Sequence, residues 1–133
     1  MHPSRKFGIM KSMTSMTVYK RGDVVLVPFP FSDHTKTKKL PAVVVSSDVY
    51  NNTSLDIIIM AITSQTEKTF AIEECLIKDW ENAGLLKPSS IKPVISTIEQ
   101  ALVLKKLGEL SSDDLISLGN ALKELLNLKA EQE

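Results

Sequence analysis

The sequence predicts a mostly-β fold of the α+β class: a small antiparallel barrel, closed or half-closed, with a C-terminal helix. Five or six short β-branched runs are separated by turn-forming residues, and these runs do not alternate with helices. Apolar residues recur at helical spacing over a long stretch only near the C-terminus. A length of 133 residues suits one domain with one core. We expect a flexible leader at residues 1–17, the domain at 18–128 and a frayed tail at 129–133.

The first predicted strand covers residues 23–27, a β-branched run that two prolines end. Residues 32–40 are polar and cationic, which predicts a loop, and residues 48–54 predict a turn. Proline cannot donate a hydrogen bond to a neighbouring strand, so Pro93 predicts an edge or a bulge. The other predicted strands are residues 42–45, 56–62, 70–72, 75–77 and 91–98, with 56–62 as the most apolar and therefore central strand.

Two later segments have helical character. Residues 78–83 predict one or two helical turns, which Gly84 ends in a left-handed conformation. Ser111 is expected to cap a C-terminal helix, with Asp114 three residues later in the manner of a capping box. The buried stripe of this helix is expected to comprise Leu115, Leu118, Leu122 and Leu125.

The composition excludes several classes of protein. Sixteen basic and sixteen acidic residues cancel, so bulk charge does not direct the chain to nucleic acid. The single cysteine, Cys75, excludes an internal disulfide and suits a reducing cytoplasm. It lies far in sequence from His2 and His34, so no metal site is expected. No apolar run approaches the roughly 20 residues of a membrane helix, and residues 1–17 lack the apolar core of a signal peptide. We therefore expect a cytoplasmic protein without a membrane partner.

One local basic cluster lies within the predicted loop. Lys36, Lys38 and Lys39 fall within four residues, and His34 is close by. Two interpretations remain open at this point: a solvated loop, or a loop that contacts the phosphates of RNA.

Six segments, taken in order, resemble the MazF/PemK toxins of bacterial type II toxin–antitoxin pairs. The resemblance covers roughly residues 19–126, and its specificity comes from the order and spacing of the six pieces. The segments are residues 19–25 (YKRGDVV), 28–33 (PFPFSD), 38–46 (KKLPAVVVS), 50–52 (YNN), 61–65 (AITSQ) and 80–89 (WENAGLLKPS).

This resemblance implies an SH3-like barrel with a C-terminal helix, assembled as a two-fold homodimer. It implies an mRNA interferase, an endoribonuclease that cleaves single-stranded RNA at short sequences without a metal or other cofactor. It also implies a cognate antitoxin that blocks the site.

The resemblance further implies which side chains carry the chemistry. In these toxins an arginine at the head of the second strand supplies acid–base and electrostatic help, and a threonine at the end of the central strand donates a hydrogen bond. The threonine is present as Thr63, for which the alternative is a strand-end hydroxyl bonded to the backbone. The arginine position is Leu40, which can neither carry charge nor transfer a proton.

Three residues are candidates to replace the missing arginine. Lys39 is adjacent to Leu40 but lacks the guanidinium fork. His34 is second, because the ordinary pKa of histidine lies near neutrality. Arg21, at the start of the first strand, is third, and its alternative is a surface charge beside a turn. The expected RNA-binding residues are Arg21, Lys36, Lys38, Ser64 and Gln65.

Two functions from different classes follow. The first is an active toxin that cleaves single-stranded mRNA by attack of the 2′-hydroxyl. The second is a catalytically impaired protein on the same scaffold that binds RNA or antitoxin. Leu40 favours the second, whereas the loop lysines and the run from Thr63 to Gln65 favour the first. Trp80 is interpreted as a core residue.

Overall fold

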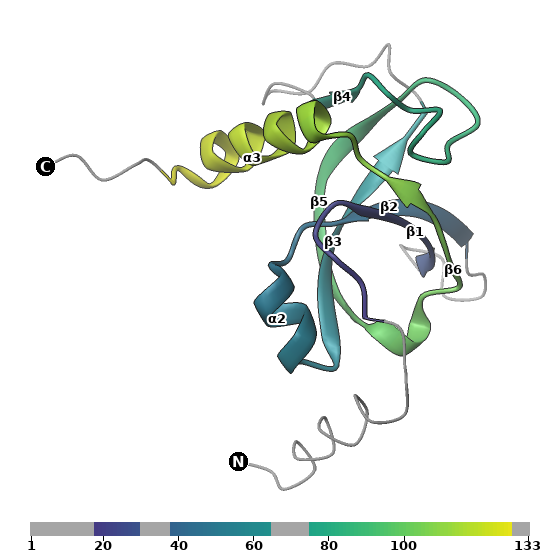
Figure 1. Cartoon of the computed structure of the whole chain (residues 1–133), viewed down its shortest axis with the longest axis vertical. Coiled ribbons are helices and arrows are strands. Elements are labelled where there is room, and N and C mark those ends of the chain that lie inside the picture. The colour runs from purple at the N-terminus through teal and green to yellow at the C-terminus, as the bar shows by residue number, and fades with distance from the viewer. Residues whose placement is uncertain (1–17, 30–37, 65–74, 129–133) are drawn as a thin grey trace, which may run out of the picture.

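A computed structural model describes residues 18–29, 38–64 and 75–128 of the chain. Within these residues six antiparallel strands form one sheet in the order β4-β5-β3-β2-β1-β6 (Figure 1). The elements are β1 (Asp23–Phe29), β2 (Lys38–Val44), α2 (Asp48–Thr53), β3 (Asp56–Thr63), β4 (Cys75–Ile77), β5 (Ser89–Glu99), the 3-10 turn η2 (Gln100–Leu102), β6 (Lys105–Glu109) and α3 (Ser112–Leu126).

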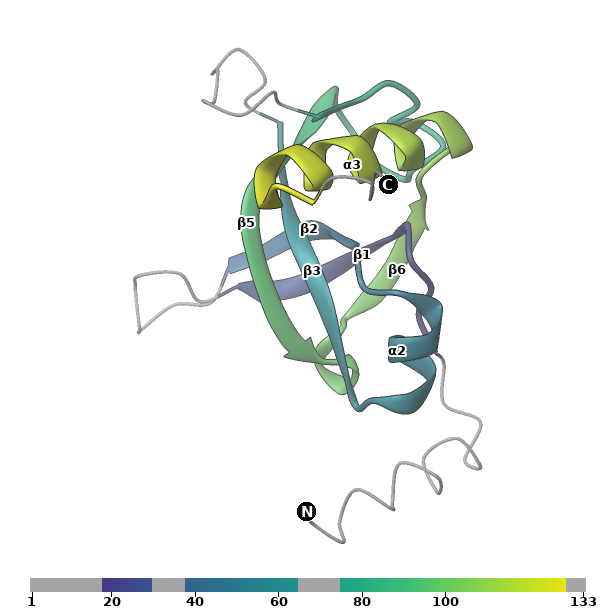
Figure 2. The same cartoon turned by 90° about the vertical axis from the view of Figure 1, so that its left-hand side faces the viewer.

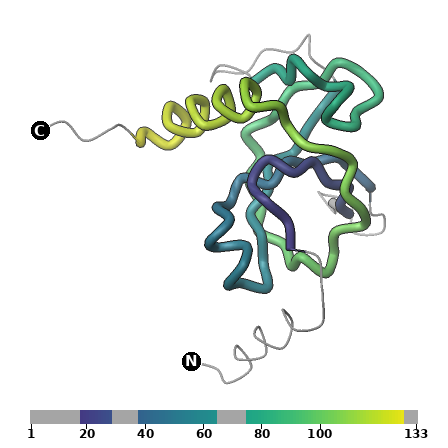
Figure 3. Tube along the Cα trace, in the orientation of Figure 1, coloured from purple at the N-terminus to yellow at the C-terminus, as the bar shows by residue number. Residues whose placement is uncertain are grey.

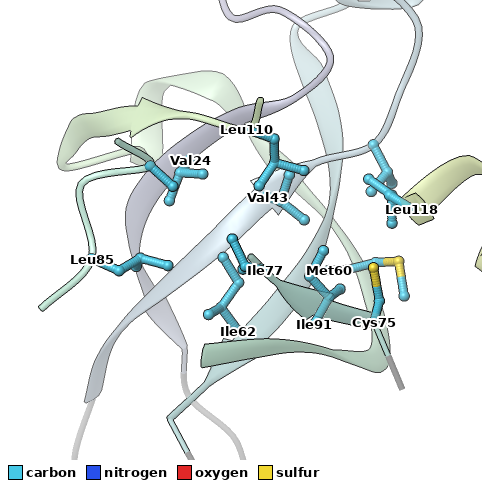
Figure 4. Packing of buried hydrophobic residues seen from close by; sticks show 12 residues of the cluster. Val24, Val43, Met60, Ile62, Cys75, Ile77, Leu85, Ile91, Leu110 and Leu118 are labelled. Carbon is cyan, nitrogen blue, oxygen red and sulfur yellow. The ribbon is translucent and has the colours of Figure 1, made fainter. Parts of the chain in front are cut away.

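The sheet curls into a half-barrel (Figure 2). Each of its faces carries a hydrophobic cluster. Alternation along each strand sends neighbouring residues to opposite faces, so Val24 belongs to the first cluster and Val25 to the second. Side chains from β1 to β5 and from α3 converge on the first cluster, which α3 covers through the fully buried Leu118 (Figure 4). The predicted class, a mostly-β antiparallel half-barrel with a C-terminal helix, is confirmed.

The apolar runs form strands as their pattern predicted, and Pro93 lies at a bulge. In the pairing of β3 with β5, Met60 is opposite Ile95 and Ile62 is opposite Ile91. One residue of β3 therefore faces three residues of β5, and Pro93 is the middle one of these three. The bulge removes the need for a donor at that position. The short strand predicted at residues 75–77 is confirmed as β4, whereas residues 70–72 lie outside the described part of the chain.

Three local expectations are wrong. The segment 48–54, predicted as a turn, contains the helix α2 over Asp48–Thr53, which the Ser47 hydroxyl caps by accepting a hydrogen bond from the Tyr50 amide at 3.1 Å. The loop predicted to extend to Leu40 ends earlier, since β2 begins at Lys38. Strand β6 was not expected at all. It pairs with β1, with Glu109 opposite Asp23, so strands far apart in sequence lie side by side (Figure 3).

The C-terminal helix begins as predicted, but its second acidic residue has another role. The Ser111 hydroxyl accepts a hydrogen bond from the Asp114 amide at 3.1 Å. The buried Asp114 carboxylate accepts from the backbone amides of Lys78 and Asp79, at 3.0 and 2.9 Å, instead of closing a capping box. The four leucines of the predicted stripe belong to or pack against the first cluster, as does Trp80. Asp114 thus ties α3 to the segment that follows β4.

Candidate functional site

A groove with a volume of about 590 Å³ opens at the end of the sheet where β2 begins and β3 ends. Leucine and proline side chains from β1, β2 and β6 form most of its apolar lining, and Thr63, Ser64 and Ser89 add polar groups. The segment 84–87, which precedes β5, forms one wall. Leu40 and Thr63 both line this groove, so the structure brings together the two positions that carry the predicted chemistry.

The pairing of β2 with β3 explains why Leu40 and Thr63 meet. Ala42 is opposite Ala61 in this antiparallel pair. Leu40 precedes Ala42 by two residues and Thr63 follows Ala61 by two residues, so alternation places both on the face of the alanines. Leu40 is half-buried and packs against the second cluster.

The wall of the groove depends on a close backbone approach to β6. Gly84 has a φ of +83°, the left-handed conformation predicted for it. A Cβ at Gly84 would overlap the carbonyl oxygen of Leu107, and a Cβ at Gly108 would overlap the backbone of Ala83. Residues 78–83 form hydrogen-bonded turns, with the Ala83 amide donating to the Asp79 carbonyl at 3.2 Å. Glycine at both positions lets the wall lie directly on β6.

The remaining predicted site residues are placed as follows. Lys38 and Lys39 are exposed at the start of β2, where Lys39 is the register partner of Pro28, and neither is part of the groove lining. Ser64 is exposed and lines the groove directly after Thr63. His34, Lys36 and Gln65 lie outside the described residues.

Arg21 lies away from the groove. Its backbone amide donates to Asp48 Oδ1 at 2.8 Å, and its guanidinium donates to the carbonyl oxygen of Val45. Val45 follows the end of β2, whereas Leu40 is near the beginning of that strand. Arg21 therefore joins the entry of β1 to α2 and β2, at the other end of β2 from Leu40, and its contact with RNA stays a prediction.

Two lysines that sequence reasoning did not assign to the site line the groove: Lys87 in the wall and Lys105 at the start of β6. Lys87 falls within a segment that carries the family resemblance, but nothing in the pattern singles out its side chain. Lys105 was inaccessible to prediction because β6 itself was not expected.

Ser90 is a second unexpected feature beside Thr63. The two residues are register partners between β5 and β3. Ser90 is fully buried, and within the described part of the chain its hydroxyl has no hydrogen-bond partner. Burying a hydroxyl without a partner costs about 1–3 kcal/mol, and this cost falls next to Thr63 at the edge of the groove.

The charged and titratable groups with shifted pKa values lie outside the groove lining. Lys106 lies 2.9 Å from Glu109 and 3.4 Å from Asp23. The hydrogen bond to Glu109, together with the charge of Asp23, raises the pKa of Lys106. Burial raises the pKa of the Cys75 thiol to about 11, and the Asp114 carboxylate adds to this rise. In the described ranges no group of three or more His, Cys, Asp or Glu residues is arranged to hold a metal ion. No helix in those ranges has the length and apolar character needed to cross a membrane.

The chain has a clear match among protein families and among solved structures. Residues 20–126 match the family described as PemK-like, MazF-like toxin of type II toxin–antitoxin system. No curated protein sequence matches the chain.

Three solved structures illustrate the likeness of the fold. An endoribonuclease from a mycobacterial species, solved in complex with its cognate antitoxin, superposes with a TM-score of 0.67 at 18% identity, over 87% of this chain and 100% of that chain. MazF from Deinococcus radiodurans superposes with a TM-score of 0.67 at 19% identity, over 85% of this chain and 100% of that chain. Toxin MazF-mt6 from Mycobacterium tuberculosis superposes with a TM-score of 0.66 at 18% identity, over 81% of this chain and 99% of that chain.

Proposed function

Because the chain belongs to the PemK-like, MazF-like toxins of type II toxin–antitoxin systems, we propose that it is an endoribonuclease that cleaves single-stranded mRNA at short sequences. The observation that carries this proposal is the groove in which the head of β2 and the end of β3 meet, with Leu40 and Thr63 in its lining. A groove open to solvent at a strand end admits an unpaired strand, whose bases and phosphates are accessible.

The proposed reaction uses the RNA's own 2′-hydroxyl. The 2′-oxygen attacks the adjacent phosphorus and loses its proton to a base, while the bond from phosphorus to the 5′-oxygen breaks. The departing 5′-oxygen takes up a proton, which leaves a 2′,3′-cyclic phosphate and a 5′-hydroxyl. No atoms of water or metal enter this balance, so the protein's task is proton transfer and stabilisation of the charged phosphorane.

We assign Thr63 as the group that donates a hydrogen bond to the phosphorane. Lys39, next to Leu40 on β2, and His34 remain the proposed sources of charge and of proton transfer, and Lys36, Lys38, Ser64 and Gln65 the proposed RNA contacts. Lys38 and Lys39 are exposed at the start of β2, so both are accessible to a strand entering from solvent.

The proposed partners follow from the same family. We propose a two-fold homodimer in the cytoplasm, held inactive by a cognate antitoxin. A mycobacterial endoribonuclease with this fold has been solved in complex with its own antitoxin.

A second function has one observation in its favour. Leu40 is half-buried against the second cluster and carries no charge. A chain without the arginine at this position fits a catalytically impaired protein that binds RNA or antitoxin.

Cleavage of a labelled single-stranded RNA, with analysis of the product ends, tests the first function directly. We expect cyclic phosphate and 5′-hydroxyl ends, and growth arrest when the chain is expressed without a partner. Thr63→Ala should slow cleavage by about 10²-fold. Thr53→Ala is the matched control, since Thr53 is exposed in α2 and its hydroxyl donates only to local carbonyls. Intact RNA binding with no cleavage would select the second function.

A further inference from the structure

We propose that the groove binds a nucleotide of single-stranded RNA, with its phosphate held by Lys87 and Lys105 and its base resting on the apolar lining. This inference rests on the proposed function, because it names the residues by which the same site holds its substrate. Neither lysine belongs to the loop cluster predicted to contact RNA.

The charge of the groove favours an anion. Lys87 and Lys105 are the charged residues in its described lining, and no carboxylate faces them there. The salt bridges of the described residues belong to Lys106, so the ammonium groups of Lys87 and Lys105 are not committed to Asp or Glu. A phosphate entering the groove would therefore meet two cations that have no anionic partner among the residues of 18–29, 38–64 and 75–128.

The backbones of both lysines are held in place. The buried Ser89 hydroxyl donates to the Lys87 carbonyl oxygen at 2.8 Å, and Lys87 follows the wall that Gly84 fixes on β6. Lys105 is the register partner of Leu26, whose carbonyl oxygen accepts from the preceding Leu104 amide at 2.8 Å. Only the side chains need to be ordered when a phosphate binds, which limits the entropy lost.

The rest of the lining suits a base. Leu26 and Leu107 provide apolar surface beside Lys105, and Leu86 at the wall is 92% exposed. An exposed leucine at the rim of a groove is free to pack against the face of an unstacked base. A volume of about 590 Å³ lies within the usual range for small-ligand sites.

Lys105 and the position of the missing arginine lie on opposite faces of the sheet. Lys105 is opposite Leu26 on β1, and Leu40 is opposite the next residue, Val27. Since β2 and β6 flank β1, the two backbones are about 10 Å apart. Neighbouring residues of β1 alternate between the two faces, so Lys105 shares the face of Leu26 and does not replace an arginine at Leu40.

Binding is measured separately from cleavage by using a short, fluorescein-labelled 2′-O-methyl RNA of mixed sequence, which has no free 2′-hydroxyl to attack. The full chain is titrated against this probe over a series of salt concentrations. Each of Lys87→Ala and Lys105→Ala should weaken binding about fivefold at 0.1 M salt and lower the log–log salt slope by about 0.7. Lys123→Ala, an exposed lysine of α3, removes the same charge away from the groove and should change neither value.

The base contact has its own variant. Leu86→Ser should weaken binding at every salt concentration and leave the slope unchanged, because it removes apolar area and no charge. Val49→Ser, at an exposed position of α2, is the matched control and should have no effect.

The outcomes separate the two proposals. If the chain cleaves RNA but both lysine variants bind like Lys123→Ala, this inference is overturned and the proposed function stands. If binding depends on both lysines but unmodified RNA is never cleaved, the inference stands and the endoribonuclease proposal fails. If the unmodified chain does not bind the probe, the proposal that the groove binds a nucleotide is wrong. The proposal is also wrong if Leu86→Ser binds the probe as tightly as Val49→Ser.

Discussion

Leu40 lies where a charged side chain would alter the chemistry of the groove, and replacing it is the sharpest test at the scale of one residue. Leu40→Arg should raise the cleavage rate by on the order of 10²–10⁴, because a positioned charged group contributes that much to such a transition state. Leu40 is half-buried near a strand end, so the arginine stem can keep the packing while its guanidinium reaches solvent. Single-turnover cleavage of labelled RNA measures the gain.

Leu40→Met is the matched control, since it preserves apolar packing without adding charge. Adding Thr63→Ala to Leu40→Arg should remove much of the gain, because the two groups would act on one transition state. A rate that none of these substitutions changes would place the active site elsewhere.

Cys75 gives a second residue-scale prediction, and it concerns pH. The thiol is 7% exposed, and its pKa is raised from 9.0 to about 11 in the folded chain. Below pH 9 the thiol is protonated in both the folded and unfolded states. Between pH 9 and 11 only the unfolded state ionises, so the stability contributed by Cys75 is lost as pH rises through this window. Urea unfolding of the wild type and of Cys75→Ala gives the free energy of unfolding of each. The advantage of the wild type over Cys75→Ala in this free energy should fall as the pH rises from 9 to 11.

The same burial predicts slow chemistry at the thiol. Iodoacetamide at pH 8 should label the folded chain far more slowly than the chain in urea, because the thiolate is the reactive form. Equal labelling rates in the folded and unfolded chains would mean that the Cys75 thiol is not buried and that its pKa is not raised.

Among the elements, α3 is tied to the segment that follows β4 by one carboxylate, that of Asp114. Asp114→Ala leaves the part-buried amides of Lys78 and Asp79 without their acceptor and removes a buried carboxylate from α3, and we expect a loss of about 3 kcal/mol in the free energy of unfolding. Asp113→Ala changes the neighbouring exposed acid in the same first turn and should cost no more than about 1 kcal/mol. Denaturant unfolding of the two variants compares them directly, and similar losses would contradict the anchoring role.

The two elements that were not predicted share a physical cause. Helix α2 has six residues, and distant partners hold it: the Gln100 amide donates to the Asn51 carbonyl oxygen at 2.9 Å. Strand β6 reads Lys-Lys-Leu-Gly-Glu, which contains no apolar run, and its pairing with β1 defines it. The pattern of apolar residues along the sequence predicts an element whose own residues are buried, as in β3. It does not predict an element whose conformation depends on contacts with residues far along the chain, as in β6.

The candidate site could be predicted to a similar extent. Thr63 and Leu40 were found because both lie in or beside apolar strands whose order the resemblance preserves. Lys105 was missed together with β6. The sequence does not show that the guanidinium of Arg21 bonds to the carbonyl of Val45, at the other end of β2 from Leu40.

For the whole molecule, we predict a dimer in solution. A single copy leaves large apolar side chains such as Leu102 and Leu104 each 49% exposed, and a small half-barrel has a modest core. A two-fold interface would cover part of this surface. Light scattering at micromolar concentration should therefore give about twice the chain mass of 14.7 kDa, and a value near 14.7 kDa would contradict the prediction.

The position of β6 beside β1 also governs when the groove is completed during synthesis of the chain. Translation proceeds at about 5–20 residues per second, so several seconds separate the emergence of these two strands from the ribosome. Until β6 arrives, the outer edge of β1 is unpaired and the groove lacks Lys105 and Leu107. A nascent or prematurely terminated chain therefore lacks one of the two lysines proposed to hold the phosphate, and the proposed RNA-binding groove is complete only once translation is nearly finished.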